Sequence, residues 1–441
     1  MKLKLTAIVA ACALLVSSAA AQQQQWKDRQ EYDMFQDMVK ETDPTKKLEK
    51  IKAWQDKYPE SAFKKEGITL RLNTYAQTQK FPEVITTANE ILALDSCDLT
   101  SLYWQVTLVR TMNATSPNPA SLDAGDKQAT QLLGCLDKIF AADKKPANVD
   151  PAAWTKARTD MESLALKTLG WISLAKKDNP GAETRIKAFL DKFPNDGEAT
   201  YWLYQTIRAQ KDPKRNSEAL FYLSRAANLP ADKGGLPDPQ RKQIDDFFGK
   251  AYTSYHGKDD AGLAELRKLA LDNPKPPAGF EIKDKGTLGV EEENKLRAEQ
   301  PQFYFWRNLK KQLDEDAAFF DRMKDAALPG KIEGTELTTF KGRLSSAKPE
   351  TNPKELVLQM DPNDPPGGAG DVTLRLDKPM RGKADVGTEI QFEGIAKEFN
   401  KDPFMVTFEV EQEKVQGWPV QAAPVKKAAP ARKAPAGKKK R

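Results

Sequence analysis

Between about residues 26 and 273, apolar side chains recur at steps of three and four positions, with short polar breaks between the runs. Ile68, Leu72 and Tyr75 show this spacing within one run. It places the apolar residues along one side of an α-helix. The pattern therefore predicts consecutive amphipathic helices, which must stack on their neighbours because no single pair can bury its apolar face alone.

Two of the breaks nearly repeat each other. Residues 54–61 (WQDKYPES) resemble residues 189–196 (FLDKFPND), and Pro59 and Pro194 are 135 positions apart, close to four units of about 34 residues. The stretch 88–95 (ANEILALD) also ends as the second helices of tetratricopeptide repeats typically do. Over roughly residues 45–272 the chain resembles tetratricopeptide-repeat proteins, and this resemblance implies stacked helical hairpins whose concave face binds a peptide or a partner protein.

The helical pattern stops after Asn273, where several prolines follow. We expect a polar linker over residues 274–300 and one connecting amphipathic helix over residues 301–328, which ends before Pro329 and Gly330. This helix would join the helical domain, residues 22–273, to a different kind of domain.

Period-two segments, typical of β-strands, occupy residues 329–418. Five short strands are predicted, and they should close on themselves to remove open edges, at residues 340–346, 355–360, 371–376, 388–397 and 404–410. The run 386–394 (VGTEIQFEG) resembles the fourth strand of an OB-fold. The predicted fold class is α + β multidomain: a tetratricopeptide-like α-solenoid followed by a small five-stranded OB-like β-barrel. We expect residues 361–370 (DPNDPPGGAG) to form a flexible connection.

The first 21 residues have the plan of a secretory signal peptide. Lys2 and Lys4 precede an apolar run, and small residues then allow cleavage between Ala21 and Gln22. A membrane anchor is disfavoured because the run is shorter than the roughly 20 apolar residues of a span. A lipoprotein signal ending at Cys12 would leave a long apolar stretch behind it. We therefore expect a periplasmic or secreted protein.

Positive charge is concentrated in residues 419–441, an Ala/Pro/Lys tail that we predict to be disordered. Without its eight basic residues and the leader's Lys2 and Lys4, the formal charge of +6 becomes −4. The overall basicity is therefore no sign of nucleic-acid binding. The tail either attaches to an anionic envelope surface or is a solvated extension, and its basic residues are Lys426, Lys427, Arg432, Lys433, Lys438, Lys439, Lys440 and Arg441.

Cys97 and Cys135 lie in consecutive predicted hairpins. They are a candidate disulfide in an oxidising compartment, and the alternative is a pair of buried free thiols. Neither belongs to a C-x-x-C motif, so the cysteines indicate neither a zinc site nor a thioredoxin-like redox site.

Little in the sequence points to catalysis. His256 is the only histidine and should cap or end a helix, and no nucleophile motif or metal-ligand cluster accompanies it. We predict no enzymatic activity, no cofactor and no metal site. Trp104, Trp171 and Trp202 have apolar neighbours at helical spacing, which favours core packing over ligand binding.

Two further stretches, residues 273–280 (NPKPPAGF) and 401–408 (KDPFMVTF), complete a whole-chain resemblance. Together with the leader, the helical array and the lysine-rich end, they resemble exported tetratricopeptide proteins of acidobacterial type, a group without an assigned activity. The hypothesis is a non-catalytic cell-envelope scaffold that binds a protein or peptide on its concave face, with no small-molecule substrate. The alternative is polyanion or nucleic-acid binding through the barrel and tail, although acidic strands make nucleic acid the less favoured ligand.

Overall fold

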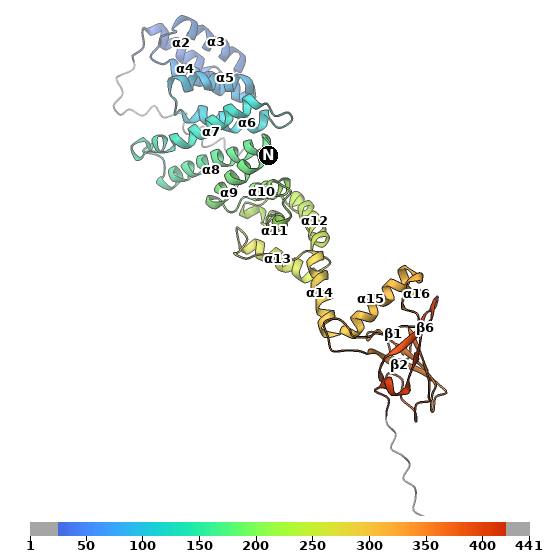
Figure 1. Cartoon of the computed structure of the whole chain (residues 1–441). Coiled ribbons are helices and arrows are strands. Elements are labelled where there is room, and N and C mark those ends of the chain that lie inside the picture. Colours follow the sequence, from blue (N-terminus) through green and yellow to red (C-terminus); the bar gives the residue numbers. More distant parts are fainter. Residues whose placement is uncertain (1–24, 420–441) are drawn as a thin grey trace, which may run out of the picture. The chain divides into compact units, whose positions relative to one another are not determined.

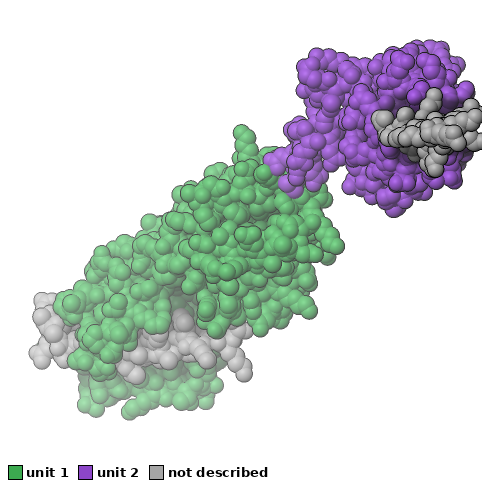
Figure 2. Space-filling model, turned by 90° about the horizontal axis from the view of Figure 1, so that it is seen from below, with its two compact units in different colours: residues 1–285 green, residues 286–441 purple. Residues whose placement is uncertain are grey.

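The structure is a computed structural model that describes residues 25–419. The chain divides into two compact units, Met1–Lys285 and Gly286–Arg441, shown in green and purple in Figure 2. The predicted signal peptide with Ala21 and Gln22, and the basic residues of the tail, lie outside the described residues.

The described part of the first unit is an array of α-helices, coloured from blue to yellow in Figure 1. From α2 to α12 each helix packs against the next along the chain, α6 also contacts α8, and α13 packs against α11. This repeating arrangement confirms the predicted helical-repeat architecture. The helices are α2 (Arg29–Lys40), α3 (Pro44–Lys57), α4 (Lys64–Gln77), α5 (Phe81–Leu94), α6 (Leu99–Met112), α7 (Pro119–Ile139), α8 (Pro151–Ala175), α9 (Asn179–Lys192), α10 (Gly197–Ala209), α11 (Asn216–Asn228), α12 (Asp238–Tyr255) and α13 (Asp260–Asp272).

The two breaks that nearly repeat in sequence also adopt nearly the same backbone conformation. Tyr58 ends α3 with φ −125° and ψ 59°, and Phe193 ends α9 with φ −125° and ψ 67°. Shortly after the second break, the Asp196 carboxylate accepts a hydrogen bond of 2.8 Å from the Ala199 backbone N–H and caps α10. The local sequence thus stops one helix and starts the next within a few residues.

The cores of neighbouring hairpins share members along the array. Trp104 packs against two successive clusters of buried side chains, and Trp171 packs against two others. Trp202 is itself a buried member of a cluster. The three tryptophans therefore pack in or against the core, as their spacing predicts.

Cys97 and Cys135 are joined by a disulfide with a Cα–Cα distance of 5.5 Å. Cys97 lies between α5 and α6, and Cys135 lies in α7, so the bond ties consecutive hairpins together. It closes a loop spanning 38 positions of the sequence.

Removing this bond with the double substitution Cys97→Ser and Cys135→Ser is expected to lower the free energy of unfolding by up to about 4 kcal/mol. That is the chain-entropy contribution for a closed loop of this length. Urea unfolding followed by tryptophan fluorescence measures the effect. A reductant should destabilise the wild type and leave the double variant unchanged; equal stability of the oxidised and reduced wild type would contradict the assignment.

The second unit begins with helices that correct two sequence predictions. Residues 274–300 are not a linker, because residues 285–299 form α14 (Lys285–Glu299), a helix without buried residues. Its glutamates, lysines and leucines favour a helix by intrinsic propensity. Because the helix buries no residue, it has no apolar stripe that a pattern search could detect. Residues 301–328 are not one helix either. The chain turns at Asp316, which ends α15 (Pro301–Glu315) with φ −139° and caps the short helix η4 (Ala317–Phe319). The short helix α16 (Phe320–Met323) follows directly.

The rest of the second unit is an eight-stranded mixed sheet that curls into a half-barrel. Its order is β1-β6-β7-β4-β3-β2-β5-β8, and only β4 and β7 pair in parallel. The strands are β1 (Ala327–Leu328), β2 (Phe340–Lys348), β3 (Glu355–Gln359), β4 (Val372–Leu376), β5 (Glu389–Phe392), β6 (Gly394–Lys401), β7 (Phe404–Val410) and β8 (Val415–Gln416).

The prediction of five strands is wrong in number for two physical reasons. The predicted fourth strand divides at Glu393: β5 pairs with β2, whereas β6 pairs with β7. Gly394 permits this bend, since a Cβ there would lie 2.7 Å from Val410 Cγ2 and 3.0 Å from Glu409 O. The remaining two strands, β1 and β8, have two residues each, which is too short for a period-two pattern to appear.

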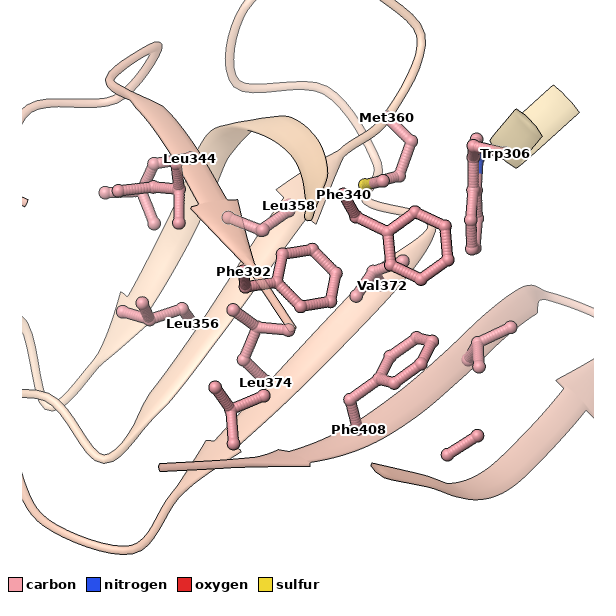
Figure 3. Close-up of a cluster of buried hydrophobic side chains, with 14 of the residues drawn as sticks. Trp306, Phe340, Leu344, Leu356, Leu358, Met360, Val372, Leu374, Phe392 and Phe408 are labelled. Carbon is pink, nitrogen blue, oxygen red and sulfur yellow. The ribbon is translucent and has the colours of Figure 1, made fainter. Parts of the chain in front are cut away.

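Aromatic side chains form the centre of the core of this unit (Figure 3). The Phe340 ring lies 5.4 Å from that of Phe392 and 5.8 Å from that of Phe408, and Trp306 of α15 packs edge-on at 5.7 Å. Helix α15 therefore covers a side of the core that the sheet leaves open.

Residues 361–370 are held in place by side chains, contrary to the expected flexible connection. Arg343 Nη2 donates to Asp361 O at 3.1 Å. Gln359 donates to Pro365 O at 2.9 Å and accepts from the Gly367 N–H at 3.1 Å. Polar residues on β2 and β3 thus fix the loop, and loop composition alone could not show this.

Within residues 25–419, we find no helix whose length and hydropathy would allow it to cross a bilayer.

Candidate binding surfaces of the helical array

A groove runs between α10 and α12, with α11 as its floor. Figure 1 shows these three helices next to one another. The groove has a volume of about 270 Å³. Its walls are aromatic, hydroxylic and cationic, and its lining residues are Tyr204, Arg208, Asn216, Ala219, Leu220, Phe247, Ala251, Ser254 and Tyr255.

Two adjacent phenylalanines on α12 have opposite roles. Phe248 is completely buried and shares the core-facing stripe with Tyr252, four positions later. Phe247 is 47% exposed and lines the groove together with Ala251, again four positions later. Consecutive residues of a helix point about 100° apart, so one aromatic side chain can stabilise the core while its neighbour faces the groove. The Phe247 ring lies 6.3 Å from that of Tyr204, edge to face.

Arg208 supplies the positive charge of the groove. Its guanidinium donates to Asn216 Oδ1 across to α11. In the described part of the chain, no carboxylate lies within 4.0 Å of this guanidinium. Burial raises the pKa of Tyr204, and the nearby Arg208 partly opposes that rise, so the phenol keeps its proton at neutral pH. The groove therefore combines an exposed ring, hydroxyl groups and a cation that forms no ion pair with the residues described.

A second cluster on α6, α8 and α10 has charges that satisfy one another. The Arg110 guanidinium lies 4.9 Å from the centre of the Trp202 ring and 2.8 Å from Glu198 Oε1. Lys167 lies 2.9 Å from Glu198 Oε2 and 2.7 Å from Asp196 Oδ2. Burial alone would raise the pKa of Glu198, but Lys167 and Arg110 more than offset it and hold that pKa below its usual value. This cluster joins three helices and leaves less charge free to recognise a ligand.

A network of ion pairs fixes α9 against α11. Arg215 contacts Glu183 and Glu218 at 2.6 Å each, and Lys187 contacts the same two carboxylates at 2.7 and 2.9 Å. The hydrogen bond from Arg215 lowers the pKa of Glu183 to about 2, so that carboxylate stays charged at any physiological pH. The network holds α11, the floor of the groove, against α9.

Arg225 anchors the end of the array from within its core. It is 3% exposed, and its guanidinium donates five hydrogen bonds to neutral oxygens, without a carboxylate among them. Three acceptors belong to the end of α13, and two belong to the turn after α9: Ala270 O (2.8 Å), Leu271 O (3.1 Å), Asn273 O (2.9 Å), Pro194 O (3.1 Å) and Asn195 Oδ1 (3.0 Å). Burial lowers its pKa from the usual value. Arg225 thus satisfies helix-end carbonyls that would otherwise be buried without a donor.

His256 lies at the end of α12, where the sequence places it. Its Nδ1 is 2.6 Å from Lys283 O, and its Nε2 is 3.4 Å from Asp259 Oδ2. Both ring nitrogens therefore have polar neighbours that hold a turn. Over residues 25–419 there is also no group of three His, Cys, Asp or Glu side chains placed to bind a metal.

Sequence reasoning found the disulfide pair and missed the groove. Phe247 and Arg208 come from different helices, and only the packing of α10 and α12 on α11 brings them together. The adjacent phenylalanines 247 and 248 give no clear local signal either, since the adjacent rings of Phe221 and Tyr222 on α11 are both buried.

The protein is thus defined by an α-helical repeat array followed by a curled mixed sheet. Its sequence matches no known protein-family model. Mannitol-1-phosphate 5-dehydrogenase of Podospora anserina is 26% identical to it over 168 residues, 35% of this chain, and the match spans only 41% of that enzyme. A tetratricopeptide repeat protein from Parabacteroides merdae aligns over 55% of this chain and 100% of its own, with 12% identity and a TM-score of 0.26. At these levels of similarity the chain is not shown to belong to either family.

Proposed function

We propose that the protein is a non-catalytic scaffold of the cell envelope that binds an extended segment of a partner protein in the groove between α10 and α12. The observation that carries this proposal is the exposed Phe247 ring beside Arg208, a cation that pairs with no carboxylate among residues 25–419. The complementary segment places an apolar side chain against Phe247 and Tyr204 and a carboxylate at Arg208.

The physical basis is the favourable burial of the exposed Phe247 ring by a partner. Covering an aromatic ring that a rigid helix exposes to water is favourable, and such rings dominate the binding energy of many protein interfaces. The floor of the groove, α11, is held to α9 by the Arg215 network and to the end of α13 by Arg225, and both flanking helices pack on α11, so the groove requires little ordering when a ligand binds.

The proposal includes export through a leader cleaved between Ala21 and Gln22. The disulfide between Cys97 and Cys135 supports it, since such bonds persist mainly in oxidising compartments. The basic tail then has access to anionic envelope surfaces.

We also propose that the half-barrel has an OB-like strand topology. The parallel pairing of β4 with β7 supports this, as does the direct passage of the chain from β5 to β6 between opposite ends of the strand order. Polyanion binding by this sheet gains less support, because prominent basic side chains on it pair with acids: Arg375 lies 2.6 Å from Glu398, and Lys397 lies 2.8 Å from Asp325.

Replacing Phe247 with alanine should weaken binding of a selected peptide at least tenfold, because the ring would lose its contact area at the centre of the interface. Peptides are selected by display on the immobilised mature protein, and affinities are measured by calorimetry. Arg208→Ala should weaken acidic peptides most. Leu94→Ala removes another exposed apolar side chain (53% exposed) and serves as the matched control.

Peptides that bind the Phe247→Ala and Leu94→Ala variants equally well would contradict this site. Failure to select any peptide with the folded wild type would contradict the scaffold function itself.

A further inference from the structure

A proline-rich segment forms an arch over α9 and α11 at the end of the array. Residues 274–280 (PKPPAGF) leave α13 and pass over a cavity of about 580 Å³. This volume is in the range of small-ligand sites. The walls are mostly apolar and include Leu190, Leu203, Tyr222, Pro276, Pro277 and Phe280.

Both ends of the arch are fixed. At the first end, Asn273 O accepts a hydrogen bond of 2.9 Å from Arg225. At the second end, the Phe280 ring lies 5.5 Å from that of Phe221. Ile282 is buried there, and its N–H donates to Ser217 Oγ at 3.0 Å. The arch is therefore an ordered part of the first unit.

The three prolines of the arch keep the cavity open. Each has a fixed φ and no backbone N–H, so this stretch cannot fold into a helix or pair as a strand over α9 and α11. A stiff segment fixed at both ends spans the gap, and the cavity beneath it exists before any ligand arrives. Such preorganisation lowers the entropy cost of binding.

Tyr222 is the polar group that the cavity leaves without a partner. Its side chain is 5% exposed, yet its hydroxyl makes no hydrogen bond to any residue in the range 25–419. Burial raises the pKa of Tyr222 to about 12, so the hydroxyl keeps its proton and can both donate and accept. The hydroxyl oxygen keeps some solvent exposure on the cavity side, so a polar group of a ligand could take the place of water there.

The charged groups around the cavity are already paired. Lys187 lies 2.9 Å from Glu218, and Lys275 lies 3.8 Å from Asp191. A charged ligand would have to compete with these pairs, whereas an uncharged one would not.

We propose that the cavity binds a small uncharged molecule with an apolar ring, which packs against the prolines and Phe280, and with one polar group that hydrogen-bonds the Tyr222 hydroxyl. This site is separate from the groove between α10 and α12 and does not depend on the peptide-binding role.

Benzamide and benzoate are suitable probes, because they share a ring and differ in charge. Their affinities for the full mature protein are measured by saturation-transfer NMR titration. Benzamide should bind roughly fivefold or more tightly than benzoate. Tyr222→Phe should weaken benzamide by roughly fivefold, the effect of one hydrogen bond. Tyr204→Phe, which removes a hydroxyl outside this cavity, should leave benzamide binding unchanged.

A second measurement keeps the test independent of any folding defect in the variant. In protein containing 3-fluorotyrosine, the ¹⁹F signal of position 222, assigned as the one missing in the Tyr222→Phe variant, should shift on addition of benzamide. The proposal is overturned if benzamide does not bind, if benzoate binds as well, or if the signal of position 222 stays unmoved.

Discussion

Replacing Arg225 with methionine is expected to lower the free energy of unfolding of the helical array by about 3–5 kcal/mol. Methionine has a similar length and remains apolar, so the loss comes from hydrogen bonding rather than from a cavity. The substitution leaves five oxygens at the ends of α9 and α13 without their donor, and four of them are backbone carbonyls. Arg225→Lys keeps the charge but cannot reach both helix ends, and an intermediate loss is expected.

Urea unfolding followed by tryptophan fluorescence measures this effect. Six of the eight tryptophans precede residue 286, so the signal reports mainly on the array. The matched control is Arg158→Met, which removes an arginine whose side chain is 38% exposed and pairs with Asp137 at the surface. Its expected cost is below about 1 kcal/mol. Equal midpoints for the two variants would show that the buried guanidinium does not anchor the array.

Replacing Phe340 with alanine is expected to destabilise the second unit by about 3–5 kcal/mol. The side chain is completely buried, and four other rings surround it at centroid distances of 5.4 to 5.8 Å. These rings come from α15, β5 and β7, so a rearrangement that fills the cavity would have to move elements on different sides of the core.

Limited proteolysis and hydrogen exchange distinguish this loss from damage to the array. Peptides from residues 286–419 should exchange faster in the Phe340→Ala variant, while those from residues 25–285 should be unchanged. Ile395→Ala removes an apolar side chain that is 38% exposed on β6 and is the control. If the two variants exchange alike, Phe340 is not the centre of this core.

The helical array could be predicted because its determinants are local and repeated. The stripe of Ile68 and Leu72 is buried as the spacing requires, and the matching breaks at Tyr58 and Phe193 have matching backbone angles. The position of each helix in the array depends only on its own apolar pattern and on that of its neighbour. The same reasoning placed Cys97 and Cys135 in consecutive hairpins, but it left open whether they are bonded.

Features that depend on distant parts of the chain could not be predicted. Arg225 looks like a surface residue in sequence, and its acceptors lie about 30 and 45 positions away. The helix α14 has no apolar stripe, and the edge strands β1 and β8 are too short to show one. The groove and the arch each join side chains from several elements, so their chemistry appears only after the helices pack.

Photo-crosslinking from position 247 in living cells tests the central claim most directly. A benzophenone amino acid replaces Phe247 in one variant and exposed Leu94 of α5 in another. The account predicts a discrete adduct from position 247 only, with the crosslink next to an acidic residue of the partner, and its loss on Arg208→Ala. The same adducts from both positions, or none from position 247 in folded and exported protein, would contradict the claim that this groove binds a partner.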